Sequence, residues 1–94
     1  MLSVSATPSF VRVAKKLHPK DKKVLDEAVQ TVLADPFVGT EKKGDLVGVF
    51  VYKFKLNKQE TLLAYALRPD KTKPGEAVLL GLGPHENFYL GLKR

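Results

Sequence analysis

The sequence predicts an α+β fold in which two helices pack on one face of a small sheet dominated by antiparallel strands, and a short helix ends the chain. Two features of the residue pattern predict it. In the N-terminal part, apolar side chains recur at three- and four-residue spacing, which is typical of amphipathic helices. After Gly44 the apolar pattern changes to a period of two, which is typical of strands. The predicted order is β-α-α-β-β-β-α.

The N-terminal part contributes one strand and two helices. Residues 2–6 alternate apolar and small polar side chains and predict a short strand. A threonine suited to an N-cap and then Pro8 follow, so a helix is expected over residues 8–17. The residue before Pro19 is disfavoured in helical backbone, which separates this helix from the next. The second helix is expected over residues 19–34, which hold an amphipathic pattern without interior glycine or proline.

Three further strands are predicted at residues 47–56, 61–68 and 77–83. Each segment is rich in β-branched, aromatic or leucine residues, and turn-forming residues separate them. We therefore expect consecutive antiparallel neighbours. Residues 37–45 contain two glycines and four charges and predict an irregular connection, and residues 85–94 predict the short C-terminal helix.

The central hairpin is predicted to have one core face and one basic face. If Lys58 and Gln59 form a two-residue turn, Lys55 lies opposite Leu62. The core face then carries large apolar side chains that the helices can cover: Phe50, Tyr52, Phe54, Leu56, Leu63, Tyr65 and Leu67.

The basic face combines cations with small residues. The same register places Lys53 opposite Ala64 and sets Lys55 and Arg68 on the same face as Ala66. A shallow floor with cationic walls suits a polyanion. The alternative is that these lysines only solubilise the exposed side of the sheet, as exposed lysines commonly do.

The C-terminal segment supplies a second group of candidates. On a helix, His85, Tyr89 and Lys93 share one stripe, and Arg94 adds a further cation for phosphate. An imidazole can donate or accept a proton near neutral pH, and a phenol can stack on a base or hold a phosphate. The alternative is that His85 caps the helix and Tyr89 packs at its edge; His18 is interpreted as structural.

The composition describes a basic chain without an evident place for a metal or cofactor. The chain has 94 residues, with 16 Lys and Arg against 10 Asp and Glu and a formal net charge of +6. We expect one domain over residues 1–94 with nucleic acid or an acidic protein as partner. With no cysteine and two distant histidines, we expect no disulfide, metal or cofactor. No apolar run is long enough to span a bilayer and no secretory signal is evident, so a cytoplasmic protein without membrane contact is expected.

Several segments together resemble a known family, the RelE/ParE superfamily of toxins from bacterial type II toxin-antitoxin systems. The resemblance is to its ParE-like branch in particular and covers nearly the whole chain. It is carried by the order and spacing of GDL at 44–46, YKFKL at 52–56, LAY at 63–65, GPHENFY at 83–89 and LKR at 92–94.

The resemblance implies a RelE-like fold and a small toxin that a cognate antitoxin neutralises. RelE-like members are ribosome-dependent ribonucleases that cut messenger RNA without a metal, by directing a 2′-hydroxyl at the adjacent phosphate. Lys53 and Lys55 match two lysines of the RelE active site, and His85 and Tyr89 match a C-terminal histidine and aromatic residue of YafQ-like members. We expect His85 to be the general acid. An antitoxin with acidic residues is expected to bind the basic flank of the first helix, which consists of Arg12, Lys15 and Lys16.

The sequence also departs from the RelE pattern. Leu62 stands where RelE has a catalytic arginine, and no arginine lies between Gly83 and Tyr89, where RelE has another; Arg68 is the candidate substitute. ParE itself inhibits DNA gyrase. The resemblance therefore implies a messenger RNA endoribonuclease acting at the ribosome, with a gyrase inhibitor or a binding module without catalysis as the alternatives, because fold does not fix function.

Overall fold

The computed structural model describes residues 2–42, 48–68 and 74–84. The elements are β1 (Ser3–Ala6), α1 (Pro8–Lys15), α2 (Pro19–Ala34), β2 (Thr40–Glu41), β3 (Val49–Leu56), β4 (Gln59–Arg68) and β5 (Glu76–Gly83). They form one five-stranded sheet in the order β1-β5-β4-β3-β2. Strands β3, β4 and β5 are antiparallel neighbours, whereas β1 pairs with β5 in parallel. The predicted α+β fold is confirmed.

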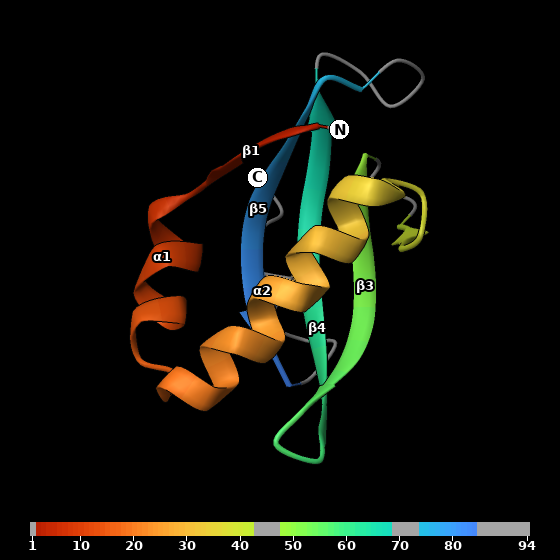
Figure 1. The fold of residues 1–94 in the computed structure, drawn as a ribbon. Coiled ribbons are helices and arrows are strands. Elements are labelled where there is room, and N and C mark those ends of the chain that lie inside the picture. The colour runs from red at the N-terminus through yellow and green to blue at the C-terminus, as the bar shows by residue number, and fades with distance from the viewer. Residues whose placement is uncertain (1, 43–47, 69–73, 85–94) are drawn as a thin grey trace.

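Both helices lie on the same face of the sheet, with α1 over β5 and α2 over β3 (Figure 1). Thr7 anchors the start of α1, because its hydroxyl oxygen accepts a hydrogen bond from the N–H of Phe10 at 3.3 Å and its own N–H donates to the carbonyl of Leu79 at 3.0 Å. Helix α1 ends at Lys15, two residues before the predicted end. Its last turn tightens into i to i−3 hydrogen bonds from Lys16 and Leu17, since the following residue must be extended before a proline.

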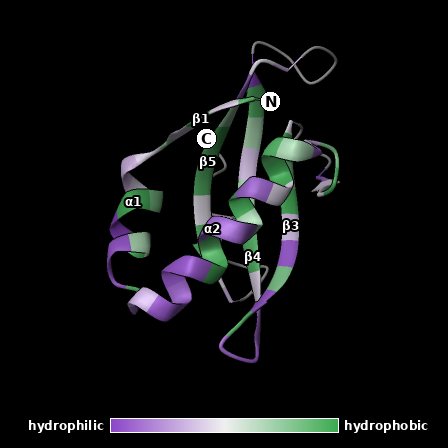
Figure 2. Ribbon diagram, in the orientation of Figure 1, coloured by the Kyte–Doolittle hydropathy of each residue, from purple (hydrophilic) through white to green (hydrophobic). Residues whose placement is uncertain are grey.

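The core lies between the helices and the sheet. Along α2, hydrophilic and hydrophobic residues alternate with the turns of the helix (Figure 2), and the hydrophobic ones meet the aromatic and leucine side chains of β3, β4 and β5. The most deeply buried members of this core are Val32, Leu63, Tyr65 and Ala77. The predicted core face of the hairpin is therefore confirmed except at Leu56, which is half-buried and lies outside the core cluster.

Tyr65 fixes the segment that follows α2. Its hydroxyl donates to the carbonyl of Pro36 at 2.8 Å and accepts from the N–H of Gly39 at 3.1 Å. A Cβ at Gly39 would lie 2.8 Å from this hydroxyl and 2.9 Å from the carbonyl oxygen of Val51, so only glycine fits. The segment was predicted to be irregular throughout; instead, the residues after Gly39 form β2, which pairs with β3.

The turn of the β3–β4 hairpin differs from the prediction. The two turn residues are Asn57 (φ 54°) and Lys58 (φ 66°), and Leu56 pairs with Gln59. A two-residue hairpin of type I′ has positive φ at both central positions, which asparagine adopts more readily than glutamine. The predicted register is therefore wrong by two residues. A shift of two leaves every side chain on its predicted face.

The predicted C-terminal helix, residues 85–94, lies outside the described residues. Within the described ranges, no helix has the length and apolar character needed to cross a bilayer.

Candidate functional site

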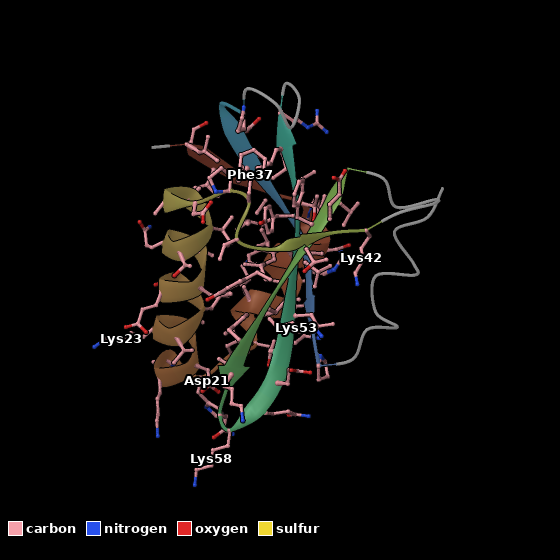
Figure 3. The ribbon with its side chains drawn as sticks, turned by 90° about the vertical axis from the view of Figure 1, so that its right-hand side faces the viewer. Asp21, Lys23, Phe37, Lys42, Lys53 and Lys58 are labelled. Carbon is pink, nitrogen blue, oxygen red and sulfur yellow. The ribbon has the colours of Figure 1, made fainter. Side chains whose placement is uncertain are left out.

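The two candidate lysines of β3 lie on the face of the sheet opposite the helices. Side chains alternate along a strand; Phe50, Tyr52 and Phe54 belong to or pack against the core, so Lys53 and Lys55 point the other way, and both are exposed. Figure 3 shows Lys53 directed away from α2. Two residues along a strand span about 7 Å, so both ammonium groups can meet one phosphate.

The observed register changes the direct neighbours of these lysines. Lys53 lies opposite Leu62 and Lys55 opposite Glu60, instead of Ala64 and Leu62 as predicted. Ala64 remains on the same face as a diagonal neighbour of Lys53, within reach of a long side chain. Glu60, opposite Lys55, reduces the positive potential at the hairpin end of this face.

Small residues extend the floor onto β5. Ala64 pairs with Gly81, and Leu62 pairs with Gly83. All four are buried, so the prediction that the floor at Ala64 is open to a polyanion is wrong, and the exposed groups of this face are the lysines. Lys53, Leu62 and Gly83 therefore form one row across three adjacent strands. With strands about 4.8 Å apart, Gly83 lies about 10 Å from Lys53.

This row places the end of β5 beside the lysines. Gly83 is the last residue of β5, and His85 follows it by two residues. The chain thus leaves the sheet at the level of Lys53. His85, Tyr89, Lys93 and Arg94 themselves lie outside the described residues.

Arg68 lies far from the two lysines. It ends β4, six residues beyond the level of Lys53, and it is exposed opposite Glu76. Six residues of strand span about 20 Å. A single phosphate cannot contact both Arg68 and Lys53, so Arg68 can meet only a different part of a long polyanion.

The basic flank of α1 is present and continues into α2. Arg12, Lys15 and Lys16 are exposed, and so are three lysines that our sequence analysis did not single out, Lys20, Lys22 and Lys23. The signal for these three was visible in the sequence, directly after Pro19. A groove of about 510 Å³ separates α1 from α2 and opens beside β1, with Lys15 and Lys22 in its lining.

The buried phenol of Tyr65 does not belong to a chemical site. Its pKa is raised to about 12, chiefly because the phenol is buried; the hydrogen bond from Gly39 lowers the pKa and the charge of Asp35 raises it. A phenol of this kind stays protonated at neutral pH, and its hydrogen bonds hold the segment that follows α2. Among residues 2–42, 48–68 and 74–84, no group of His, Cys, Asp or Glu side chains is arranged to bind a metal.

The same fold occurs in solved toxin structures. The toxin in the intact E. coli RelBE toxin-antitoxin complex superposes with a TM-score of 0.69 at 16% identity, over 92% of this chain and 99% of that one. A mutant of E. coli RelE in the free state gives 0.71 at 15% identity, over 98% and 92%. The RelBE2 toxin-antitoxin complex from Mycobacterium tuberculosis gives 0.66 at 20% identity, over 89% and 98%. At these identities the likeness shows the fold.

No curated protein matches the sequence. A family model does: the ParE-like toxin of the type II bacterial toxin-antitoxin system matches residues 4–93. The chain therefore belongs to the ParE-like toxins of type II toxin-antitoxin systems, within the RelE/ParE superfamily.

Proposed function

We propose that this toxin is a messenger RNA endoribonuclease that acts at the ribosome and arrests translation. The observation that carries the proposal is the row of Lys53, Leu62 and Gly83 across the sheet. It sets the two candidate lysines beside the strand end from which the chain continues to His85. Cations and a titratable imidazole are what metal-independent phosphodiester cleavage requires.

The proposed reaction needs a base, a cation and an acid. The 2′-oxygen of one nucleotide attacks the adjacent phosphorus, and its proton goes to one of the two lysines, which acts as the base in its neutral amine form. The other lysine stabilises the negative charge that develops on the phosphate. His85 donates a proton to the leaving 5′-oxygen as the bond from phosphorus to that oxygen breaks. Tyr89 positions a base or the phosphate.

Other cations of this chain are proposed to replace the two arginines that RelE has and this chain lacks. Leu62 lies directly opposite Lys53, so the place of the missing arginine adjoins a lysine that can supply charge. Arg68, Lys93 and Arg94 are proposed to contact other phosphates of the RNA. For Arg68 this follows from its distance of about 20 Å along the strand.

The proposed partners are the ribosome with its messenger RNA and a cognate antitoxin. Toxins with the same fold were crystallised as RelBE complexes. In this chain the basic flank of Arg12, Lys15 and Lys16, extended by the lysines of α2, is suited to an acidic segment. The compartment proposed for this activity is the cytoplasm, where ribosomes and messenger RNA meet.

Inhibition of DNA gyrase is the second candidate, and the ParE-like family model favours it. The two activities are separated by inducing the toxin in bacteria and following labelled methionine and thymidine during the first minutes. The ribonuclease reading predicts an early fall in methionine incorporation and cleaved messenger RNA. An early fall in thymidine incorporation with intact messenger RNA would overturn it in favour of gyrase, and binding to ribosomes without cleavage would leave a binding module.

A matched pair of variants connects this test to the site. Lys53→Ala with Lys55→Ala removes two cations from the candidate face, whereas Lys20→Ala with Lys23→Ala removes two cations elsewhere. Both variants should fold, because exposed lysines contribute little to stability. Only the first should lose the arrest of translation. Equal toxicity of the two variants would contradict the assignment of the basic face.

A further inference from the structure

A second cavity opens where the start of α2 meets the turn of the β3–β4 hairpin. Its volume is about 230 Å³, below the roughly 300–1,000 Å³ of pockets that take drug-sized ligands, so it suits a smaller group. It lies on the helix face of the sheet, because its lining residue Leu82 belongs to the core. Figure 3 shows Asp21 at the start of α2, beside the hairpin that turns at Lys58. We call it the hairpin cavity.

The polar side chains of the hairpin cavity come from three separate elements. Asp21 belongs to the first turn of α2, Asn57 to the hairpin turn, and Gln59 and Thr61 to β4. An ionised carboxylate only accepts hydrogen bonds, whereas the two side-chain amides both donate and accept. The Thr61 hydroxyl donates to the carbonyl of Gln59 at 3.1 Å, so it can only accept from a ligand. The cavity therefore presents a mixed pattern of donors and acceptors.

Asp21 is the one charged side chain in this lining. It is half-buried, and its carboxylate has no hydrogen-bond donor or ion-pair partner among the residues that the structure describes. A carboxylate partly removed from water is stabilised by a ligand that donates hydrogen bonds to it. Its charge also repels a phosphate group. The cavity thus favours an uncharged ligand with N–H donors.

Guanine fits these groups better than the other RNA bases do. Its Watson–Crick edge has two adjacent donors, N1–H and the N2 amine, which match the two oxygens of the Asp21 carboxylate. Its O6 and N7 atoms are acceptors, for which the amides of Asn57 and Gln59 are suitable donors. The apolar lining can cover the flat ring, as in sites that hold an unstacked base. This apolar lining includes Leu17, Leu56 and Leu82.

Gly83 connects the hairpin cavity with the basic face of the sheet. It lines the cavity, and it also ends the row of Lys53, Leu62 and Gly83. Two strand spacings, about 10 Å, separate it from Lys53. An RNA chain that passes around this end of β5 can therefore place a phosphate at the lysines and a nearby base in the cavity.

We propose that the hairpin cavity binds a guanine base of the messenger RNA, close to the cleaved phosphate, and that Asp21 selects this base. Asp21 is a specificity residue and takes no part in the proton transfers. Single-stranded RNA is commonly recognised in this way, through the hydrogen-bonding edge of an unstacked base. The inference rests on the proposed function for one point, that the guanine belongs to the RNA that is cut.

Free mononucleotides test the cavity without any cleavage. The labelled full chain is titrated with GMP and with inosine monophosphate, which has the same phosphate but lacks the N2 amine, and is followed by NMR. GMP should shift the backbone amides of Asp21, Asn57 and Gln59 and bind about tenfold more tightly. No shift at these amides, equal binding of the two nucleotides, or tighter binding of AMP or CMP would overturn the proposal. Tighter binding of acetyl-arginine amide at the same amides would overturn it in favour of a protein side chain.

A matched pair of variants tests Asp21 itself. Asp21→Asn and Asp26→Asn each remove one negative charge from α2, but Asp26 lies outside the lining of the hairpin cavity. An amide cannot accept both N–H groups, so Asp21→Asn should lose the tenfold preference for GMP over inosine monophosphate, whereas Asp26→Asn should keep it. The preference is a ratio measured on one protein, so a change in stability cancels. A preference that survives in Asp21→Asn, or is lost in both variants, would refute the assignment.

Cleavage mapping identifies the source of the base. Ribosome-bound messages with guanine or inosine at each position around the cut are compared. The parent protein should cut about tenfold faster with guanine at one position, and Asp21→Asn should cut the two messages alike. Cleavage that is indifferent to inosine at every position would overturn the proposal. Absence of any cleavage would refute the proposed function and with it the source of the base, while the GMP titration separately shows whether the cavity takes guanine, so the two failures are distinguishable.

Discussion

Replacing Tyr65 by phenylalanine removes one buried hydroxyl and keeps the ring. The ring is fully buried and stacks on Phe50 at 5.5 Å between centroids, and phenylalanine retains both features. What is lost is the hydrogen bond to the Pro36 carbonyl and the acceptor for the N–H of Gly39. Unpaired buried groups cost about 1–3 kcal/mol. We expect a loss of this size near pH 8, which for a chain of this length lowers Tm by about 4–8 °C per kcal/mol.

The same residue gives a pH dependence of known sign. The pKa of Tyr65 is raised from 10.0 to about 12, so the folded protein holds its phenol proton at a pH where the unfolded chain releases it. The stabilisation is complete below pH 10 and is lost as pH rises toward 12. At pH 11 about 1.4 kcal/mol of the full 2.7 kcal/mol is lost, at about 1.4 kcal/mol for each pKa unit.

Urea denaturation at pH 8 and pH 11, monitored by circular dichroism, measures this effect as a difference. The stability gap between the parent protein and Tyr65→Phe should narrow by about 1.4 kcal/mol at the higher pH, because only the parent has a phenol at this site. Groups titrating elsewhere affect both proteins equally. A gap that stays constant would refute the assignment of the buried, doubly hydrogen-bonded phenol.

The remaining predictions concern Gly39, the turn of the β3–β4 hairpin and the proposed general acid. Gly39→Ala should destabilise the protein by about 1–3 kcal/mol, measured by urea denaturation, because its Cβ would lie 2.8 Å from the Tyr65 hydroxyl; an unchanged midpoint would contradict the close approach. Lys58→Gly should stabilise the hairpin by about 0.5–1 kcal/mol, since its φ is 66°, and a lower thermal midpoint would show that this positive φ carries no cost. His85→Gln cannot titrate and should slow cleavage of ribosome-bound messenger RNA by about 10²–10⁴-fold; cleavage at the parent rate would make His85 structural.

Local signals predicted the helices and the side-chain faces of the hairpin. Helix α2 begins and ends where Pro19 and Asp35 predicted, because capping and proline effects depend on adjacent residues. The predicted register was wrong because the sequence analysis placed the turn at Lys58-Gln59, whereas the turn is Asn57-Lys58. The choice depends on which residues tolerate positive φ, and both pairs contain Lys58, so the asparagine was the deciding signal.

Contacts between distant residues could not be predicted in the same way. The chain just before β2 is held by the Tyr65 hydroxyl, which bonds to backbone groups 26 and 29 residues earlier, and no local sequence pattern predicts such a bond. The row of Lys53, Leu62 and Gly83 likewise depends on the pairing of β4 with β5, which includes a register shift between Ala64 and Tyr65. The sequence could supply the candidates for the site, whereas only the sheet shows which of them are neighbours.

The parallel pairing of β1 with β5 has a consequence for how the chain folds. Ser3 pairs with Glu76, so the sheet can be completed only after the residues between these two strands have left the ribosome. Contacts of such sequence separation form slowly. Until β1 pairs with it, β5, whose residues are mostly apolar and buried in the folded protein, exposes an unpaired strand edge that favours aggregation. β1 thus covers the edge of β5, the last of the described strands, and substitutions that prevent β1 from pairing should reduce the yield of soluble toxin without changing any group proposed for the chemistry.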